Sequence, residues 1–195
     1  MELNLKNKTA LITGASRGIG LAIKQALEKE GVECISWSRE TGQDLEKEMP
    51  ELPDVDIIIN NVGGGGAFNQ WDCKYKVYKN VGIMARITCG WLLEYKPWGR
   101  VITIASIYGT HPGDNAGFAA AKAAQIMFMK SLAYQNKYPG ITFNCVSPAE
   151  VSDAGTPKNV KLKANDVANL VTFLCSNKAD MITGQNIVIG EYNNA

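Results

Sequence analysis

The stretch Thr13-Gly14-Ala15-Ser16-Arg17-Gly18-Ile19-Gly20 decides the fold of this 195-residue chain. It follows a short apolar run at residues 9–12 and opens an amphipathic run at 19–27, which predicts a strand, a glycine-rich turn and a helix. Glycines let the backbone approach a ligand closely, and the start of a helix offers unpaired N–H groups to a phosphate. The spacing G-x-x-x-G-x-G differs from the general dinucleotide fingerprint G-x-G-x-x-G. For this motif alone, a tight turn made for packing is the alternative.

Short, nearly continuous apolar runs alternate with helical patterns along the chain. Such runs are typical of parallel strands buried on both faces of a sheet. We expect strands at 8–13, 32–37, 55–60, 100–105, 141–146 and 186–189, and helices at 19–30, 71–95, 116–137 and 165–175, the last with Asn165 as its N-cap. This alternation predicts a single α/β domain over residues 1–195, built on a doubly wound parallel sheet. Ligand then binds at the carboxyl ends of the strands.

Composition and charge exclude several classes of partner. The formal net charge is +1, which argues against a nucleic-acid partner or an acidic membrane surface. The first eight residues are polar, and no apolar run reaches the ~20 residues that a membrane span needs. The five cysteines are scattered and odd in number, which favours reduced thiols and a cytoplasmic protein. The one histidine, His111, lies beside Pro112 in a polar loop, and we expect no metal site.

Further signatures fall at the ends of the expected strands and in the helices that follow them. They are Asn60-Asn61-Val62-Gly63, Lys79-Asn80-Val81-Gly82, Ile104-Ala105-Ser106-Ile107, Phe118-Ala119-Ala120-Ala121-Lys122, Asn144-Cys145-Val146-Ser147-Pro148 and Ile182-Thr183-Gly184-Gln185. Together with the glycine turn, and in this order, they resemble the short-chain dehydrogenase/reductase family over essentially the whole chain. The resemblance implies a Rossmann-type fold, a nicotinamide cofactor, and hydride transfer between that cofactor and a carbonyl or secondary alcohol.

The resemblance also implies a catalytic set of Asn80, Ser106 and Lys122, with Phe118 in the position of the family's tyrosine. Ser106 would donate a hydrogen bond to the substrate oxygen, Lys122 would bind the nicotinamide ribose hydroxyls, and Asn80 would hold a water in a proton relay. The missing tyrosine hydroxyl is the group expected to exchange the substrate proton. Loss of a positioned acid/base typically costs ~10²–10⁴-fold in rate. The chain is therefore expected to be an oxidoreductase impaired at its acid/base position.

The phenylalanine leaves several interpretations open. The chain is either a variant engineered from a tyrosine enzyme or one whose hydroxyl was lost naturally. The rival function is a non-catalytic NADP(H)-binding sensor or structural protein. A third hypothesis keeps catalysis but moves the proton donor to Tyr108, two residues after Ser106, or to a water held by Asn80 and Lys122.

The second expected strand indicates the cofactor. It ends Ser36-Trp37-Ser38-Arg39, where an acid would bind the ribose hydroxyls of NAD and repel a 2′-phosphate. Arg39, Ser38 and Arg17 in the glycine turn instead suit a phosphate, so we expect NADP(H). The full set of expected cofactor-binding residues, several of them implied only by the resemblance, is Gly14, Ser16, Arg17, Gly18, Ile19, Gly20, Ser38, Arg39, Asp44, Asn60, Val62, Gly63, Lys122, Pro148 and Val151.

Two segments are shorter than in the family that the chain resembles. Only about 20 residues separate Arg39 from Asn60, so one strand–helix unit is expected to be cut short. The segment 149–163 is brief for a substrate lid, which favours an open site and a bulky or carrier-borne small-molecule substrate. The resemblance also implies a homodimer or homotetramer packed through the helices at 71–95 and 116–137. Their high apolar content favours this, although deep burial within one chain is the alternative.

Overall fold

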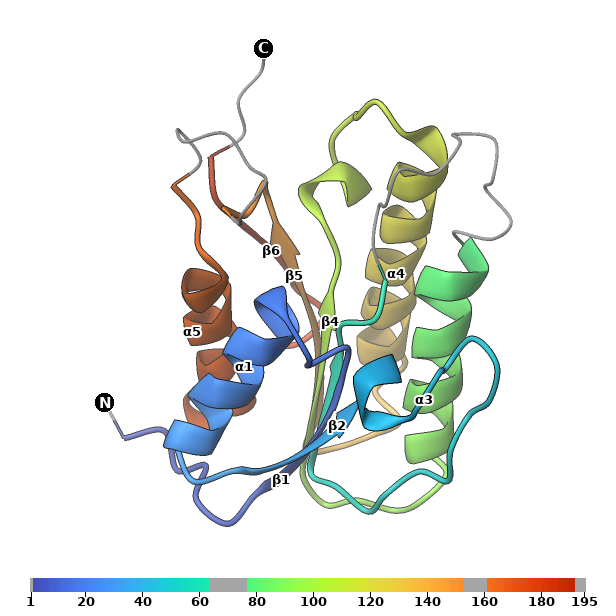
Figure 1. Cartoon of the computed structure of the whole chain (residues 1–195). Coiled ribbons are helices and arrows are strands. Elements are labelled where there is room, and N and C mark those ends of the chain that lie inside the picture. Colours follow the sequence, from blue (N-terminus) through green and yellow to red (C-terminus); the bar gives the residue numbers. More distant parts are fainter. Residues whose placement is uncertain (1, 64–76, 153–160, 192–195) are drawn as a thin grey trace.

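Six parallel strands form one sheet in the computed structural model, which describes residues 2–63, 77–152 and 161–191. The strands run in the spatial order β2-β1-β3-β4-β5-β6 (Figure 1). Their bounds are β1 Thr9–Thr13, β2 Glu33–Trp37, β3 Ile57–Asn60, β4 Gly99–Ile104, β5 Ile141–Pro148 and β6 Asn186–Ile189. Each pairing is parallel, and every strand overlaps its expected range. The predicted doubly wound α/β fold is confirmed.

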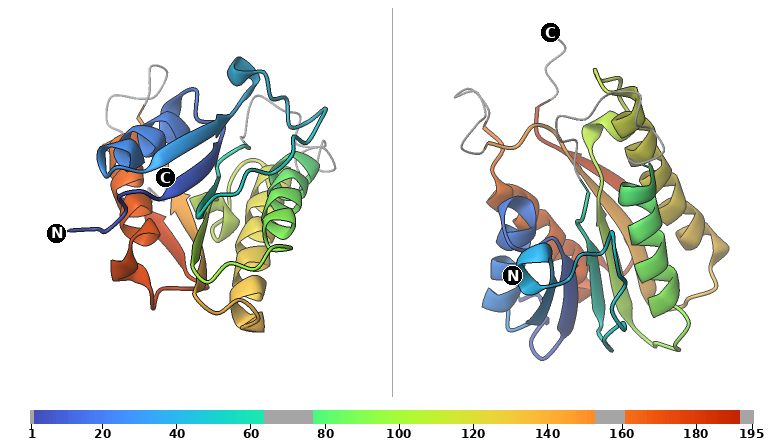
Figure 2. Two further views of the ribbon diagram at one scale, coloured as in Figure 1. Left: turned by 90° about the horizontal axis from the view of Figure 1, so that it is seen from below. Right: turned by 45° about the vertical axis from the view of Figure 1, so that its right-hand side comes forward.

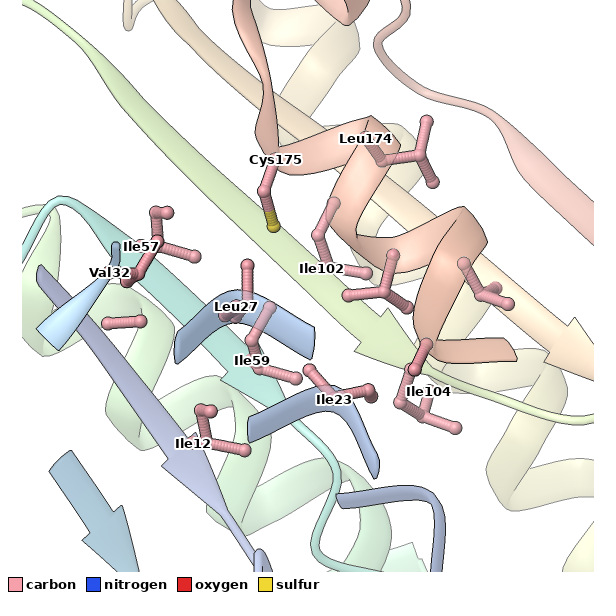
Figure 3. Packing of buried hydrophobic residues seen from close by; sticks show 14 of the residues in the cluster. Ile12, Ile23, Leu27, Val32, Ile57, Ile59, Ile102, Ile104, Leu174 and Cys175 are labelled. Atoms are coloured by element: carbon pink, nitrogen blue, oxygen red, sulfur yellow. The ribbon is translucent and has the colours of Figure 1, made fainter. Parts of the chain in front are cut away.

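Helices cover both faces of the sheet. Helices α1 (Gly18–Lys29) and α5 (Ala164–Cys175) pack together on one face, and α3 (Ile83–Trp91) and α4 (Ala116–Gln135) cover the other (Figures 1 and 2). Two apolar cores result. The core beneath α1 and α5 is filled by branched side chains from both layers, among them Ile12, Ile23, Leu27, Ile59, Ile102 and Leu174 (Figure 3). Because the strands are covered on both faces, they read as continuous apolar runs in the sequence.

Residues 71–76 of the helix expected at 71–95 lie outside the described ranges, and residues 77–91 are helical without a break. The π-helical turn η2, Tyr78–Gly82, precedes α3, which ends at Trp91 rather than at residue 95. Pro97 sets an outer limit for this helix, because proline both lacks an N–H group and restricts the residue before it. The π-helical turn could not be read from apolar spacing, yet it carries Asn80. Such turns are frequent at functional sites.

The expected N-cap of the last helix, Asn165, is wrong. Helix α5 begins at Ala164 and Lys163 is its N-cap. The Asp166 carboxylate accepts the backbone N–H of Lys163 at 2.9 Å, so an acid in the first turn sets the start of the helix. Asn165 therefore lies inside the first turn.

The connection from β2 to β3 lacks the usual helix. The short 3₁₀ turn η1, Arg39–Thr41, is followed by an irregular segment up to residue 56. Strand β2 is consequently the outer strand of the sheet on this side. The predicted shortening of one strand–helix unit is confirmed.

Candidate active site

The glycine-rich turn joins the end of β1 to the start of α1, where the backbone is tightly packed. A Cβ at Gly20 would overlap the carbonyl oxygen of Gly14 and lie 2.5 Å from Asn61 Nδ2, so only glycine fits there. The Asn61 amide donates to the carbonyls of Thr13 and Gly14, both at 3.0 Å. The Thr13 hydroxyl accepts the N–H groups of Asn61 and Val62. These bonds fix the turn against the loop that follows β3.

A cleft of about 750 Å³ opens at this turn and runs along the carboxyl ends of β1, β2 and β3. Twelve of the sequence-predicted cofactor residues line it: Gly14, Ser16, Arg17, Gly18, Ile19, Gly20, Ser38, Arg39, Asp44, Val62, Gly63 and Val151. Residues separated by more than a hundred positions in the chain thus line one cavity. Its size and its open helix terminus fit an extended phosphate-bearing ligand.

Three other predicted residues do not line this cleft. Pro148 is buried at the end of β5, and Lys122 is buried in α4. Asn60 is also buried, and its amide donates to the hydroxyls of Thr88 at 2.9 Å and Thr103 at 3.4 Å. The next residue, Asn61, faces the cleft instead. Sequence reasoning missed Asn61, although successive residues of a strand point to opposite faces, so the two asparagines could not both face the ligand.

The end of the cleft near β2 carries Arg17 and Arg39 beside the acids Glu40, Asp44 and Glu46. Helix α1 presents its N-terminus to the same cleft. Arg17 is the N-cap of α1, but its side chain makes no capping bond, and the first turn contains no acid. The N–H groups of that turn are therefore oriented for an anion. Arg39 lines the same cleft. Ser38 has a further local role, because its Oγ accepts the Thr41 N–H at 3.2 Å while Thr41 Oγ1 accepts the Ser38 N–H at 2.9 Å.

Lys122 belongs to α4, and its buried side chain reaches the end of β4. Its side chain donates to the Ile104 carbonyl oxygen at 3.0 Å, and only 4% of the residue is exposed. Burial lowers the pKa of Lys122 to about 8. The ring of Phe118, one helical turn earlier, lies 5.6 Å from the Lys122 ammonium nitrogen. The structure therefore brings this pair together as the sequence spacing predicted.

Asn80 approaches the same lysine from the π-helical turn. A Cβ built on Gly63 would overlap Asn80 Oδ1 and lie 3.5 Å from Lys122 Nζ. Gly63, in the loop after β3, thus leaves room for Asn80 beside Lys122. The Gln125 amide, fully buried, donates to the Asn80 carbonyl oxygen at 2.6 Å. Sequence reasoning missed Gln125, although its spacing of three residues from Lys122 placed it on the same helix face.

Ser106 lies at the end of β4, directly before the 3₁₀ turn η3, Ile107–Gly109. Its Oγ accepts the Tyr108 N–H at 3.3 Å, and this bond leaves the hydroxyl proton available to another acceptor. The side chain of Tyr108 is 42% exposed and packs against Gly113, where a Cβ would contact the Tyr108 ring. Tyr108 is thus accessible, but it lies on a different element from the Phe118–Lys122 pair.

The described residues contain no helix with the length and apolar character of a membrane span. Within the same ranges, no three His, Cys, Asp or Glu side chains gather as a metal-binding group. Four of the five cysteines fall in the described part of the chain, and each is a free thiol.

Comparisons with known proteins agree with this geometry. A family model described as short chain dehydrogenase matches residues 43–165. The 3-oxoacyl-(acyl-carrier-protein) reductase FabG of Escherichia coli (strain K12) is 32% identical, over 95% of this chain and 96% of the relative. Nodulation protein G of Rhizobium sp. (strain N33) is 31% identical, over 94% and 95% respectively.

Solved structures share the fold. A blue fluorescent protein from a metagenomic library, in complex with NADPH, matches with a TM-score of 0.82 and 22% identity, over 98% of this chain and all of that one. A 7 alpha-hydroxysteroid dehydrogenase complexed with NADH and 7-oxo glycochenodeoxycholic acid matches with a TM-score of 0.79 and 23% identity, over 97% and 95%. From its sequence relatives and its family model, the chain belongs to the short-chain dehydrogenase/reductase family of oxidoreductases.

Proposed function

We propose that this chain is an NADP(H)-binding oxidoreductase of carbonyl or secondary alcohol substrates, impaired because Phe118 occupies the acid/base position. The observation that carries the proposal is the convergence of Asn80, Lys122 and Phe118 next to a cleft lined by Arg17 and Arg39. Bound NADP(H) would supply or accept the hydride. The residues of the chain would bind it, orient the substrate and hold the proton.

Each side chain has a distinct part in this proposal. The Lys122 ammonium would donate to the nicotinamide ribose hydroxyls, and the Ser106 hydroxyl would donate to the substrate oxygen. Asn80 would hold a water near Lys122. The Phe118 ring has no exchangeable proton, so the chain lacks the group that would move the substrate proton. Binding is thereby retained while proton transfer is weakened.

The preference for NADP(H) follows from charge. Arg17 and Arg39 line the cleft at the end of β2, where an arginine can hold a 2′-phosphate by charge-assisted hydrogen bonds. We expect tighter binding of NADP⁺ than of NAD⁺ in calorimetric titration. Arg39→Asp should lower the affinity for NADP⁺ about tenfold or more and shift the preference toward NAD⁺, because hydrogen bonds to charged groups contribute ~1.5–3 kcal/mol.

The matched control for this substitution is Arg86→Asp, at an exposed arginine of α3 that does not line the cleft. It changes the net charge equally and should leave both affinities unchanged. Equal affinity of the unaltered chain for the two cofactors would overturn the assignment to NADP(H).

The substrate class is proposed to be bulky or carrier-borne. The relative FabG is named for reduction of 3-oxoacyl groups on acyl-carrier protein, and the sequence is short between 149 and 163, where a substrate lid is expected. Residues 153–160 of that segment lie outside the described ranges. Carrier-linked 3-oxoacyl thioesters are therefore the first substrates to test. We also propose that the protein is cytoplasmic.

The rival function is a non-catalytic NADP(H)-binding protein that senses the cofactor or serves as a structural subunit. Phe118 itself favours it, because a binder needs no acid/base. Ser106 argues against it, since a cofactor binder has little use for a hydrogen-bond donor toward substrate. The two functions are separated by the Phe118→Tyr experiment described in the Discussion.

We also propose a homodimer or homotetramer built through η2, α3 and α4. Val77, just before η2, Tyr78 on η2 and Met127 on α4 leave 39%, 46% and 61% of their surface exposed, and a second copy would cover this apolar surface. Ile126 and Met129 are buried within the chain itself, so only part of the apolar content needs a partner. Light scattering at micromolar concentration should report at least a dimer, and a monomer would refute this assembly.

A further inference from the structure

An ion pair joins two walls of the cleft that are far apart in sequence. Lys79 Nζ lies 2.8 Å from Glu46 Oε1, and the two side chains are 17% and 26% exposed. Both residues line the cleft that we assign to the cofactor. Glu46 belongs to the segment after β2, and Lys79 belongs to the π-helical turn. The pair thus joins the π-helical turn to the part of the cleft wall that follows β2 and also carries Arg39.

The wall that carries Glu46 has little regular structure of its own. Its local bonds centre on Asp44, whose Oδ1 accepts the Glu46 N–H at 3.2 Å and whose carbonyl accepts the N–H groups of Lys47 and Glu48. Leu45 is buried in the core beneath α3 and α4. This short turn stands where a strand–helix unit is cut short, so its position depends on such attachments rather than on a helix or a neighbouring strand.

The wall that carries Lys79 is the π-helical turn that also holds Asn80, the asparagine of the proposed catalytic set. Lys79 directly precedes Asn80, and the carbonyl of Asn80 is held by Gln125 of α4. One side of this turn is therefore attached to α4 and the other to Glu46. Gln125 holds the position of Asn80, whereas the bond to Glu46 holds the side of the turn that lines the cleft.

We propose that the Glu46–Lys79 ion pair is a brace that preorganises the adenosine end of the cofactor cleft, which makes both residues affinity determinants for the adenosine half of NADP(H). The inference rests on the proposed cofactor binding and deepens it. A wall held in place before binding reduces the ordering cost when the ligand arrives. Both partners are then needed. Replacement of either one should weaken binding, although one replacement removes a negative charge and the other a positive charge.

A simple electrostatic role predicts something different. The cofactor is anionic, so Glu46→Gln would remove a repelling charge and raise its affinity, whereas Lys79→Met would remove an attracting charge and lower it. The brace predicts that both single substitutions lower affinity in the same direction, by about fivefold, which corresponds to about 1 kcal/mol. The exchange of the two charges, Glu46→Lys with Lys79→Glu, should recover most of the loss.

The experiment is calorimetric titration of the full chain and these three variants with NADPH, 2′,5′-ADP and reduced nicotinamide mononucleotide. We expect the losses with NADPH and 2′,5′-ADP, while affinity for the mononucleotide stays unchanged. The matched control is Lys8→Met, which breaks the half-buried Lys8–Asp56 pair of 3.0 Å at the opposite end of the strands and should change none of the three. Circular dichroism checks that each variant is folded. If either Glu46→Gln or Lys79→Met fails to fold, the other substitution and the charge exchange still decide the test.

The outcomes separate the brace from the function on which it rests. Failure of the unaltered chain to bind NADPH at all would refute the proposed function. If that chain binds NADPH, opposite shifts in the two single variants, no shift in either, or an equal loss with the mononucleotide would each overturn the brace.

Discussion

The substitution Phe118→Tyr would supply the acid/base group that the proposed site lacks. Phe118 lies in the first turn of α4, where its N–H donates to the N-cap Asn115 Oδ1 at 3.0 Å. Its ring is partly exposed and lies 5.6 Å from Lys122 Nζ. Because the helix start is fixed by the cap and the ring is kept, the substitution adds a hydroxyl with little change in packing. The new phenol would stand near the lysine and the open side of the site.

The size of the effect follows from proton transfer. A free phenol has a pKa near ~10, and a neighbouring ammonium stabilises its ionised form. Burial lowers the pKa of Lys122 to about 8, so the lysine remains charged at neutral pH and can act in this way. A positioned acid/base contributes ~10²–10⁴-fold. We therefore expect Phe118→Tyr to raise the hydride-transfer rate at least about 100-fold at pH 7, equivalent to about 2.7 kcal/mol of activation free energy.

The assay follows NADPH absorbance over a panel of ketones, acyl thioesters, including carrier-linked 3-oxoacyl groups, and oxidised sugars. Cofactor affinity should change little, because the glycine turn, the two arginines and Lys122 are untouched. Phe128→Tyr is the matched control, since it adds the same hydroxyl on the same helix, at a residue packed against the core beneath α3 and α4. It should leave the rate unchanged.

Two results would refute this reasoning. If Phe118→Tyr is inactive on every substrate while Lys122→Ala abolishes cofactor binding with either residue at 118, the non-catalytic binder is the better description. If the unaltered chain already turns over rapidly and Tyr108→Phe stops it, the proton donor lies on η3 and the role given to position 118 is wrong.

Three further predictions concern stability. The pKa of Lys122 falls from 10.5 in the unfolded chain to about 8 in the fold, so the unfolded state binds more protons between these values and stability rises with pH there. Between pH 7 and 10.5 the free energy of unfolding in urea should rise by up to about 3 kcal/mol more in the unaltered chain than in Lys122→Met. A difference between the two chains that does not change with pH would contradict the buried ammonium. Gly20→Ala should cost more than about 4 kcal/mol, because its Cβ would meet the Gly14 backbone. Gly18→Ala, with φ +57 and no atom within 4 Å of its Cβ, should cost only about 1–2 kcal/mol, and thermal melts showing equal losses would refute the close approach at Gly20. Gln125→Met removes the buried donor to the Asn80 carbonyl and should cost about 1–3 kcal/mol in urea unfolding, whereas a neutral effect would show that this bond does not hold the turn.

The sequence alone determined the strands, the glycine turn and the Phe118–Lys122 pair. Buried parallel strands must be continuously apolar, and a helix places residues i and i+4 on one face, so both features are local and readable. The absence of an acid before Glu40 at the end of β2 and the presence of Arg39 are equally local. These signals also carried the family resemblance, and the comparisons confirm it.

Only the tertiary structure decided which asparagine faces the cleft and how Asn80 reaches Lys122. Asn60 and Asn61 are adjacent in the chain, but Asn60, the last residue of β3, contacts Thr88, whereas Asn61, just after the strand, contacts the glycine turn. The π-helical turn around Asn80 depends on contacts with α4, which no local pattern encodes. The Glu46–Lys79 pair likewise forms only when the segment after β2 and the turn before α3 are brought together, because contacts between residues far apart in the chain arise from packing rather than from local propensity.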